Sequence, residues 1–285
     1  MFSKMKKYVK LLFVKKESIR VPLMYGKILE NKNIFITGGG SGIGYEIAKT
    51  CLLNNANVVI CGRNMSKLEE EKWRLCSDNE SLVENIVDKI IICQFDIASY
   101  SNLKNVMKEI NEKHNIKIDS LINNAGVASK TVVGNSSEND YDNVMNVNLK
   151  YTYFMCQEFS NYLIEQKIKE NILNISSSSG ARPAISPYMV SKWGIVGLTQ
   201  ELAKKLIKYG IVVNGIAPGP TASGMLKNDN NDLYLESSPS KRYCDGSEIG
   251  NLAVYLISDM AKMIVGETIF ITGGCGTLTK DDICY

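Results

Sequence analysis

The chain has little of what metal sites and disulfide frameworks need. Its 285 residues include one histidine, His114, and eight cysteines, none of which forms a CxxC pair. We therefore expect no metal site. Several cysteines lie in apolar runs such as "VVICG" and "IIICQF", where a free thiol behaves as a small core residue. This usage predicts free thiols in a reducing, cytoplasmic compartment.

Long apolar runs and a strong charge imbalance are also missing. No run approaches the roughly 20 residues that span a bilayer, and the longest one near the N-terminus, "LLFV", is shorter than the apolar core of about 7–15 residues in a signal peptide. The net charge of +3 is too small to indicate a nucleic-acid partner. With 45% apolar and 22% charged residues, the composition is that of a globular protein.

From about residue 33, short β-branched runs alternate with amphipathic stretches of helix length. This alternation predicts right-handed crossovers and a doubly wound, Rossmann-like parallel sheet with helices on both faces, in a single α/β domain. The expected strands are 33–37, 58–61, 89–95, 120–123, 172–176, 212–216 and 269–272, and the expected helices include 43–53, 103–113, 138–166, 188–209 and 248–258. Residues 224–241 are expected to form a mobile loop.

The first expected strand leads into a glycine-rich stretch, "TGGGSGIG", and then directly into a helix. Backbone N–H groups at such a turn, together with a helix N-terminus, receive the pyrophosphate of a dinucleotide. Gly38 would permit the tight turn, Gly42 the approach of the ligand, and Gly44 close packing of helix on strand. An ordinary tight turn is the alternative, but the position after the first strand favours a dinucleotide.

The end of the second expected strand indicates which dinucleotide binds. An acidic residue there would hold a ribose hydroxyl, whereas an arginine would accommodate a 2′-phosphate. The stretch "VVICGRN" has Gly62 in place of a carboxylate, followed directly by Arg63. We therefore predict NADP(H), with NAD(H) as the alternative if Arg63 is only a solvated surface residue.

Two further motifs complete a recognisable set. "NNAG" spans Asn123–Gly126, and "SPYMVSKWG" contains Tyr188 and Lys192 four residues apart. Spacing alone would allow an ordinary surface pair on one helix face. Taken with the glycine turn, however, the sequence from about Asn31 to Gly274 resembles the classical short-chain dehydrogenase/reductase family. The resemblance implies a seven-stranded sheet and a metal-independent oxidoreductase that transfers hydride between nicotinamide and a small-molecule ketone or secondary alcohol.

The resemblance also implies catalytic roles. Tyr188 would be the general acid or base, and Lys192 would hold the nicotinamide ribose and lower the tyrosine pKa. Ser177 would position the substrate carbonyl, and Asn148 would anchor a water-mediated proton path, with Asn146 as the alternative. The serine is chosen within the run 176–179 by counting back from the following glycine, and the eleven positions from Ser177 to Tyr188 are about two fewer than the family commonly has.

The remaining cofactor contacts follow from the same resemblance. Asp96 would touch the adenine edge beside Ile97, Asn124 and Gly126 would line the cleft, and the "PGP" segment would pass under the nicotinamide. The carboxamide contact falls on Ser223, with Thr221 as the alternative, and Thr272 stands where the family often has aspartate. The full predicted cofactor set is Gly38, Ser41, Gly42, Ile43, Gly44, Arg63, Asp96, Ile97, Asn124, Gly126, Tyr188, Lys192, Pro218, Gly219 and Ser223.

Two regions leave the function open. Residues 1–26 form a basic arm before the catalytic domain, 27–285; wrapped as a helix, the arm would put Phe2, Met5 and Val9 on one face. It could contact an anionic membrane, which would suit a reductase of a lipid or lipid-linked precursor, or pack on protein. The substrate walls, 181–187 and 224–241, name no substrate; Arg182 could meet an acidic group or face solvent.

Two further points concern the protein as a whole: whether it is an enzyme, and how it assembles. A non-catalytic dinucleotide sensor or scaffold on the same fold is the rival to the enzyme. Family resemblance further implies a homodimer or homotetramer, built largely from the helices at 138–166 and 188–209.

Overall fold

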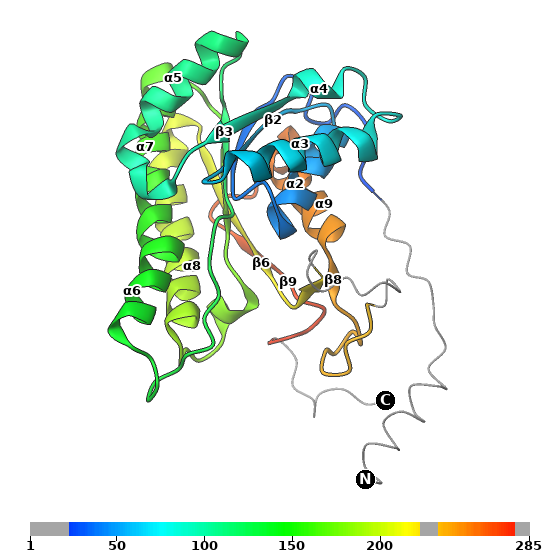
Figure 1. Cartoon of the computed structure of the whole chain (residues 1–285). Helices are drawn as coiled ribbons and strands as arrows, with labels where there is room; N and C mark the ends of the chain where they lie inside the picture. Colours follow the sequence, from blue (N-terminus) through cyan, green and yellow to red (C-terminus); the bar gives the residue numbers. More distant parts are fainter. Residues whose placement is uncertain (1–22, 223–232, 277–285) are drawn as a thin grey trace.

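Apolar side chains on both sides place strand β1 (Asn33–Thr37) at the centre of the fold. Ile34 and Ile36 pack into one hydrophobic core, and Phe35 packs into the core on the opposite face. A strand buried on both faces is typical of a parallel sheet that is covered by helices. The structure is a computed structural model that describes residues 23–222 and 233–276, and it has this architecture (Figure 1).

The main sheet has seven parallel strands in the order β3-β2-β1-β4-β5-β6-β9, which confirms the predicted sheet. Its remaining strands are β2 (Asn57–Gly62), β3 (Ile90–Gln94), β4 (Ser120–Asn123), β5 (Asn171–Ile175), β6 (Val212–Pro218) and β9 (Thr268–Ile271). In register, Ile36 of β1 lies opposite Ile60 of β2 and Ile122 of β4. A short parallel pair, β7 (Thr221–Ala222) and β8 (Cys244–Asp245), follows the end of β6.

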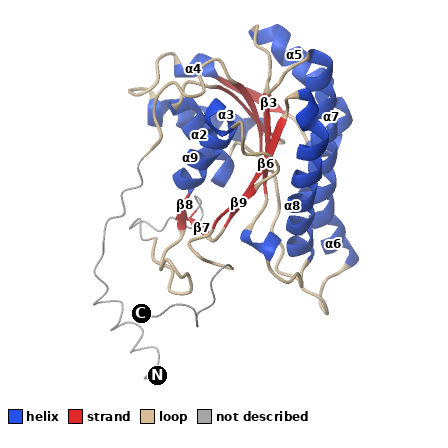
Figure 2. Cartoon of the chain, turned by 180° about the vertical axis from the view of Figure 1, so that it is seen from behind, coloured by secondary structure: helices blue, strands red, loops and turns tan. Residues whose placement is uncertain are grey.

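Helices cover both faces of this sheet. They are α2 (Gly42–Leu53), α3 (Met65–Asn79), α4 (Ile86–Lys89), α5 (Leu103–His114), α6 (Glu138–Met145), α7 (Tyr151–Gln166), α8 (Pro187–Leu206) and α9 (Gly246–Ile257). The core on one face holds side chains from α2, α3 and α9, and the core on the other holds side chains from α5, α7 and α8. Figure 2 shows α2 and α9 on one side of the strands and α7 and α8 on the other.

The predicted helix 138–166 is interrupted. A π-helical turn, η2 (Asn146–Lys150), separates α6 from α7, and such a turn inside a helix is frequent at functional sites. The expected helix 188–209 begins one residue earlier, at Pro187, and ends in the 3₁₀ turn η4 (Ile207–Tyr209). The bounds of β1 and β4 are the expected ones, and those of the other five strands differ by one or two residues at one or both ends.

Parts of two predicted segments lie outside the described residues. These are most of the basic arm and residues 224–232 of the expected mobile loop. The rest of that loop is described as hydrogen-bonded turns. The Leu235 N–H donates to the carbonyl of Lys241 at 2.9 Å, and the Ser240 N–H donates to the carbonyl of Gly273 at 3.0 Å. The second of these bonds ties the loop to the segment that follows β9.

The strand order reverses between β1 and β4, because β1 pairs with β2 on one side and with β4 on the other. In an open parallel sheet, ligands bind outside the carboxyl ends of the strands at such a reversal. The glycine-rich turn follows β1 and the "NNAG" stretch follows β4. The topology therefore brings these two motifs together at one place.

Candidate active site

The glycine-rich turn has the conformation that its sequence predicts. Gly38 has φ +64° and Gly42 has φ +54°, in the left-handed region that glycine adopts without strain. Gly44 has no room for a side chain, because a Cβ there would overlap the Gly38 carbonyl and lie 2.5 Å from Nδ2 of Asn124. Ser41 is the N-cap of α2, but its side chain makes no capping hydrogen bond. Its hydroxyl and the first N–H groups of α2 are thus free to hold a phosphate.

Asn124 holds this turn against the end of β4. Its Nδ2 donates to the carbonyls of Thr37 and Gly38, each at 3.1 Å. The Thr37 hydroxyl oxygen accepts in return from the N–H groups of Asn124 and Ala125, at 3.0 and 3.1 Å. These four bonds fix the cradle before any ligand binds. The residues present therefore fit the pyrophosphate of a dinucleotide.

Arg63 and Asp96 follow the neighbouring strands β2 and β3. The Arg63 side chain is exposed, while its carbonyl accepts from Nε2 of Gln94 at 3.0 Å. Asp96 caps the next turn, since its Oδ1 accepts from the Ala98 N–H at 3.0 Å. Ile97 is half-buried against the core. The three predicted residues lie together at one end of the sheet, where an adenosine would reach from the glycine turn.

Helix α8 positions Tyr188 and Lys192 through its first turn. Ser186 is the N-cap and its hydroxyl oxygen accepts from the Met189 N–H at 3.2 Å, while Pro187 occupies the first helical position. Serine and proline are favoured at these two places. The helix therefore begins immediately before Tyr188, which stands half-buried at its N-terminal end.

Lys192 is a buried cation. Its side chain is 6% exposed, and Nζ donates to the carbonyl of Ile175, the last residue of β5, at 2.9 Å. Nζ lies 5.7 Å from the centre of the Tyr188 ring. Burial lowers the pKa of Lys192 from 10.5 to about 8. A cation that is desolvated beside a tyrosine can stabilise the negative charge of a tyrosinate.

Asn148 lies in the π-helical turn and is almost fully buried. Its Oδ1 accepts from the Val127 N–H at 2.8 Å, and its Nδ2 donates to the Val127 carbonyl at 2.9 Å. A Cβ at Gly126 would lie 3.2 Å from this Oδ1 and 3.8 Å from Nζ of Lys192. Gly126 therefore lies beside both Asn148 and Lys192, whereas the alternative, Asn146, is only half-buried.

Ser191 is a site residue that the sequence analysis missed. Its hydroxyl donates to the Tyr188 carbonyl at 2.7 Å and accepts from Nδ2 of Asn148 at 3.2 Å. It thus joins α8 to the π-helical turn. The one signal available was its position three residues after Tyr188, on the same side of the helix.

The serine run divides into distinct roles. The Ser176 hydroxyl donates to the Lys192 carbonyl at 2.9 Å and holds β5 to α8. Ser178 is buried. Ser177 is half-buried, and its Oγ accepts from the Ser179 N–H at 3.1 Å as the cap of a 3₁₀ turn (Ser178–Ala181). Among the described residues no acceptor takes its hydroxyl proton, so the Ser177 hydroxyl can donate to a ligand.

The segment after β6 closes the other side of the site. The Gly219 N–H donates to the carbonyl of Ile271 at 2.9 Å, and a Cβ at Gly219 would lie 2.8 Å from Cα of Thr272. Pro218 ends β6. The Thr221 hydroxyl donates to the Gly219 carbonyl at 2.9 Å, and Ser223 lies outside the described residues.

The described part of the chain also bears on metal ligands, disulfides and membrane-spanning helices. No set of three His, Cys, Asp or Glu side chains there could hold a metal ion. The seven described cysteines are free thiols. None of the described helices is both long and apolar enough to cross a membrane.

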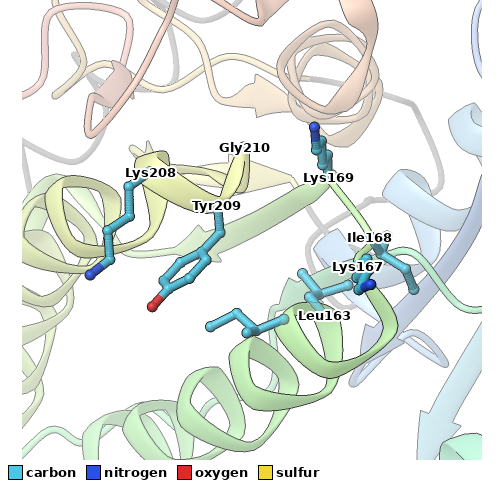
Figure 3. Close-up of a pocket in the computed structure, with 8 residues that line it drawn as sticks. Leu163, Lys167, Ile168, Lys169, Lys208, Tyr209 and Gly210 are labelled. Carbon is cyan, nitrogen blue, oxygen red and sulfur yellow. The ribbon is translucent and has the colours of Figure 1, made fainter.

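A separate cavity of about 300 Å³ lies at the opposite edge of the sheet. It is formed by the end of α7, the loop before β5 and the turn before β6, as Figure 3 shows. Its lining residues include Leu163, Lys169, Lys208 and Tyr209. None of the predicted site residues lines it.

Comparison with known proteins agrees with this arrangement. The sequence profile of the short chain dehydrogenase family matches residues 32–233. The chain therefore belongs to this family, and it is an oxidoreductase acting on C=O or CH–OH groups rather than a non-catalytic dinucleotide sensor.

Several of the similar proteins are named as 3-oxoacyl-[acyl-carrier-protein] reductases. The chain is 32% identical over 252 residues to the 3-oxoacyl-[acyl-carrier-protein] reductase FabG of Staphylococcus epidermidis, covering 86% of this chain and 98% of the relative. A crystal structure of a 3-oxoacyl-[acyl-carrier protein] reductase from Brucella melitensis superposes with a TM-score of 0.78 at 25% identity, covering 91% of this chain and 97% of that one. A second structure of such a reductase from that organism, described with bound NAD, has a TM-score of 0.77 at 25% identity, with the same coverage.

Proposed function

We propose that the protein is an NADP(H)-dependent reductase of a ketone, with Tyr188 as its proton donor. The observation that supports this most is the buried Lys192 ammonium, whose Nζ lies 5.7 Å from the centre of the Tyr188 ring. Burying a cation costs free energy, and a buried ammonium interacts more strongly with a nearby negative charge than an exposed one does. The positive charge would stabilise negative charge that develops on Tyr188 during the reaction.

The reaction divides between cofactor and protein. The nicotinamide cofactor supplies the hydride to the carbonyl carbon. Tyr188 donates its phenolic proton to the carbonyl oxygen as negative charge develops there, and in the reverse direction the tyrosinate accepts it. Lys192 stabilises that tyrosinate electrostatically.

Ser177 and Asn148 position the reacting groups. The Ser177 hydroxyl donates a hydrogen bond to the carbonyl oxygen and so orients the substrate toward Tyr188. Asn148 holds the loop at Val127 through two hydrogen bonds, at 2.8 and 2.9 Å. That loop adjoins Lys192 through Gly126, so Asn148 supports the route by which water returns a proton.

For the substrate class we propose a 3-oxoacyl thioester. Support comes from the printed activity of the Staphylococcus epidermidis relative, which acts on 3-oxoacyl groups on an acyl carrier protein. Oxidation of NADPH by acetoacetyl thioesters tests this directly. Purified protein that oxidises NADPH with other ketones but with no 3-oxoacyl thioester would reject the substrate class while leaving the reductase intact.

For the cofactor we propose NADP(H), supported by the exposed Arg63 guanidinium after β2. The test is equilibrium binding of NADPH and NADH, read by nicotinamide fluorescence, in wild type and Arg63→Ala. We expect NADPH to bind at least about tenfold tighter and the variant to lose most of that difference. Lys208→Ala, which removes a positive charge at the opposite edge of the sheet, controls for net charge. Equal affinity for the two cofactors would assign NAD(H) instead.

For the assembly we propose a homodimer or homotetramer built through α7 and α8. Exposed aromatic and apolar side chains support this: Tyr153 on α7, and Val190 and Trp193 on α8. Sedimentation velocity gives the oligomeric state. A monomer at micromolar concentration would overturn the proposal, and Tyr153→Glu is expected to shift an oligomer toward monomer.

A further inference from the structure

Arg182 carries a buried donor that has no acceptor. Its Nε is buried and, within the described part of the chain, donates to no hydrogen-bond partner. The guanidinium lies against the backbone of Gly276, where a Cβ would come within 2.8 Å of Nη2. A buried donor left unpaired costs free energy, and the cost is greater for a charged group.

The ion-paired arginines of the chain differ from it. Arg242 donates from Nη1 and Nη2 to the two carboxylate oxygens of Glu248, at 2.6 and 2.7 Å. Arg74 donates to Glu71 at 3.0 Å. No described carboxylate forms an ion pair with Arg182. Its planar fork of donors, which matches a carboxylate or a phosphate, is therefore left for another group.

The position of Arg182 is fixed within the candidate active site. It lies five residues after Ser177 and six before Tyr188, in the loop that joins them. The Trp193 indole N–H donates to the Arg182 carbonyl at 2.6 Å, and the Val133 N–H donates to the Ile185 carbonyl at 2.9 Å. Both ends of the loop are thus held, which reduces the entropy lost when a ligand binds.

Gly276, which the Arg182 guanidinium contacts, also belongs to a segment that borders the candidate active site. Gly276 follows β9, and the last residue of β9, Ile271, accepts the hydrogen bond from Gly219. The guanidinium therefore bridges the wall that carries Ser177 and Tyr188 and the wall that continues from β6 and β9. A substrate lying between these walls would pass it.

We propose that Arg182 determines substrate specificity by binding an anionic group, a carboxylate or a phosphate, on the substrate. This inference rests on the proposed reductase function and adds a charge requirement to it. The anion pairs with the guanidinium, which forms no ion pair with a described carboxylate. Arg182 acts in binding, so its effect falls on KM and leaves kcat nearly unchanged.

Two matched pairs of substrates test the proposal and identify the anion. Acetoacetyl-phosphopantetheine carries a phosphate that acetoacetyl-N-acetylcysteamine lacks, and acetoacetate carries a carboxylate that its methyl ester lacks. In wild type we expect kcat/KM to favour one anionic member by at least about tenfold. Arg182→Gln should remove most of that preference through KM, with the neutral member changed by less than about twofold. Arg182→Lys should retain part of the preference, because it keeps the charge without the fork.

Three kinetic outcomes would overturn the proposal. One is a wild type with no anion preference, and another is an equal loss for both members of a pair in Arg182→Gln. The third is a preference that appears only after deletion of residues 277–285, which would make Asp281 or Asp282 the partner of Arg182. Lys208→Gln, at the cavity of Figure 3, controls for net charge and should leave both ratios unchanged.

A binding measurement keeps this test separate from the proposed reaction. In a Trp73→Phe background Trp193 is the remaining tryptophan, and its indole is hydrogen-bonded to Arg182. Titration of the NADPH complex with phosphopantetheine or acetoacetate should change its fluorescence, and Arg182→Gln should weaken binding at least about tenfold. Equal binding by the variant would overturn the proposal. A protein that binds the anion through Arg182 yet reduces none of the four substrates would instead reject the proposed function.

Discussion

The central sheet has a carboxyl edge, where its parallel strands end, and an amino edge, where they begin. The two edges differ in how charged side chains are paired. At the carboxyl edge, Lys192 is buried without a carboxylate and donates to a backbone carbonyl. At the amino edge, Glu170 accepts from Lys32 at 2.5 Å and from Lys262 at 3.2 Å. The carboxyl edge thus retains a charge that only a ligand or a reacting group can use. The amino edge balances its charges within the protein.

The same contrast holds for two charged groups whose pKa is shifted by desolvation. Asp119, before β4, is half-buried, and desolvation raises its pKa from 3.8 to about 6 even though Ser120 and Asn33 donate hydrogen bonds to it. Its hydrogen bonds join the starts of β1 and β4. Lys192, by contrast, adjoins Tyr188. A shifted pKa indicates function only where the group faces a ligand site.

Cavity size does not distinguish the edges either. The cavity in Figure 3 lies at the amino edge, yet its lysines are exposed and its lining carries no buried polar group that lacks a partner. At the carboxyl edge, Arg182 Nε is buried without a partner among the described residues, and the Ser41 hydroxyl makes no capping hydrogen bond. Buried oxygens of Asn171 and Thr268, at the amino ends of β5 and β9, also lack a partner there. Neither empty volume nor an unpartnered polar atom is therefore enough by itself to locate the site.

The largest expected effect is on catalysis at the carboxyl edge. Tyr188→Phe removes the phenolic proton while keeping the ring, so kcat should fall by about 10²–10⁴-fold. NADPH affinity, measured by fluorescence, should change by less than about threefold, because the hydroxyl serves mainly the substrate. A variant that keeps more than about a tenth of the wild-type kcat would show that another group donates the proton.

The next effect concerns the cradle of the dinucleotide. Gly44→Ala would place a Cβ 2.5 Å from Asn124 Nδ2 and closer still to the Gly38 carbonyl, so α2 must move away from β4. We expect NADPH binding to weaken by at least about tenfold and the free energy of unfolding to fall by about 1–3 kcal/mol.

Gly197→Ala is the matched control for unfolding, since a Cβ there meets no atom within 4 Å. An alanine inside α8 should leave stability unchanged or raise it by about 0.5–1 kcal/mol. If the two variants unfold at the same denaturant concentration, the close approach at Gly44 is not a constraint on the fold.

Much of this site could be predicted from local sequence. The glycine turn has its own signal, because positive φ and close backbone approach exclude other residues at Gly38, Gly42 and Gly44. The seven strands were also predictable, since alternation of β-branched runs with helices determines a parallel sheet. The predicted bounds of β1 and β4 are confirmed, and the other strands differ by a residue or two because local patterns fade at strand ends.

The missed features have non-local causes. The partner of Lys192 is a backbone carbonyl 17 residues away, and Ser191 meets Asn148 across 43 residues. A backbone acceptor places no requirement on the type of residue that carries it.

Helix α3 was also missed from the sequence, for a local reason. Leu68 and Leu75 are its buried apolar residues, and the charged stretch between them hides its apolar face.

A further effect is expected at the amino edge, where it changes stability but not catalysis and depends on pH. The pKa of Asp119 is higher in the folded protein, about 6, than its ordinary 3.8. The unfolded chain therefore loses this proton first, and stability relative to Asp119→Asn should decline by about 2–3 kcal/mol as pH rises from 4 to 6, then stay level. Urea unfolding of both proteins from pH 4.5 to 8 gives the difference. A difference that grows with rising pH would mean that the carboxylate is stabilised, not desolvated.

The smallest effect tests whether the charge balance of the amino edge matters beyond that edge. Glu170→Gln removes the nearer of the two carboxylates paired with Lys32 and Lys262, and Asp259 remains 3.6 Å from each lysine. Because these ion pairs are partly exposed, the expected loss is about 1 kcal/mol of unfolding free energy or less. Glu165→Gln breaks the exposed pair with Lys104 and should cost only a few tenths of a kcal/mol. Neither change should alter kcat, since both pairs lie away from Tyr188. A reduced kcat in Glu170→Gln at unchanged stability would mean that the two edges are coupled through the strands, because β5, which starts next to Glu170, ends at the carbonyl that holds Lys192.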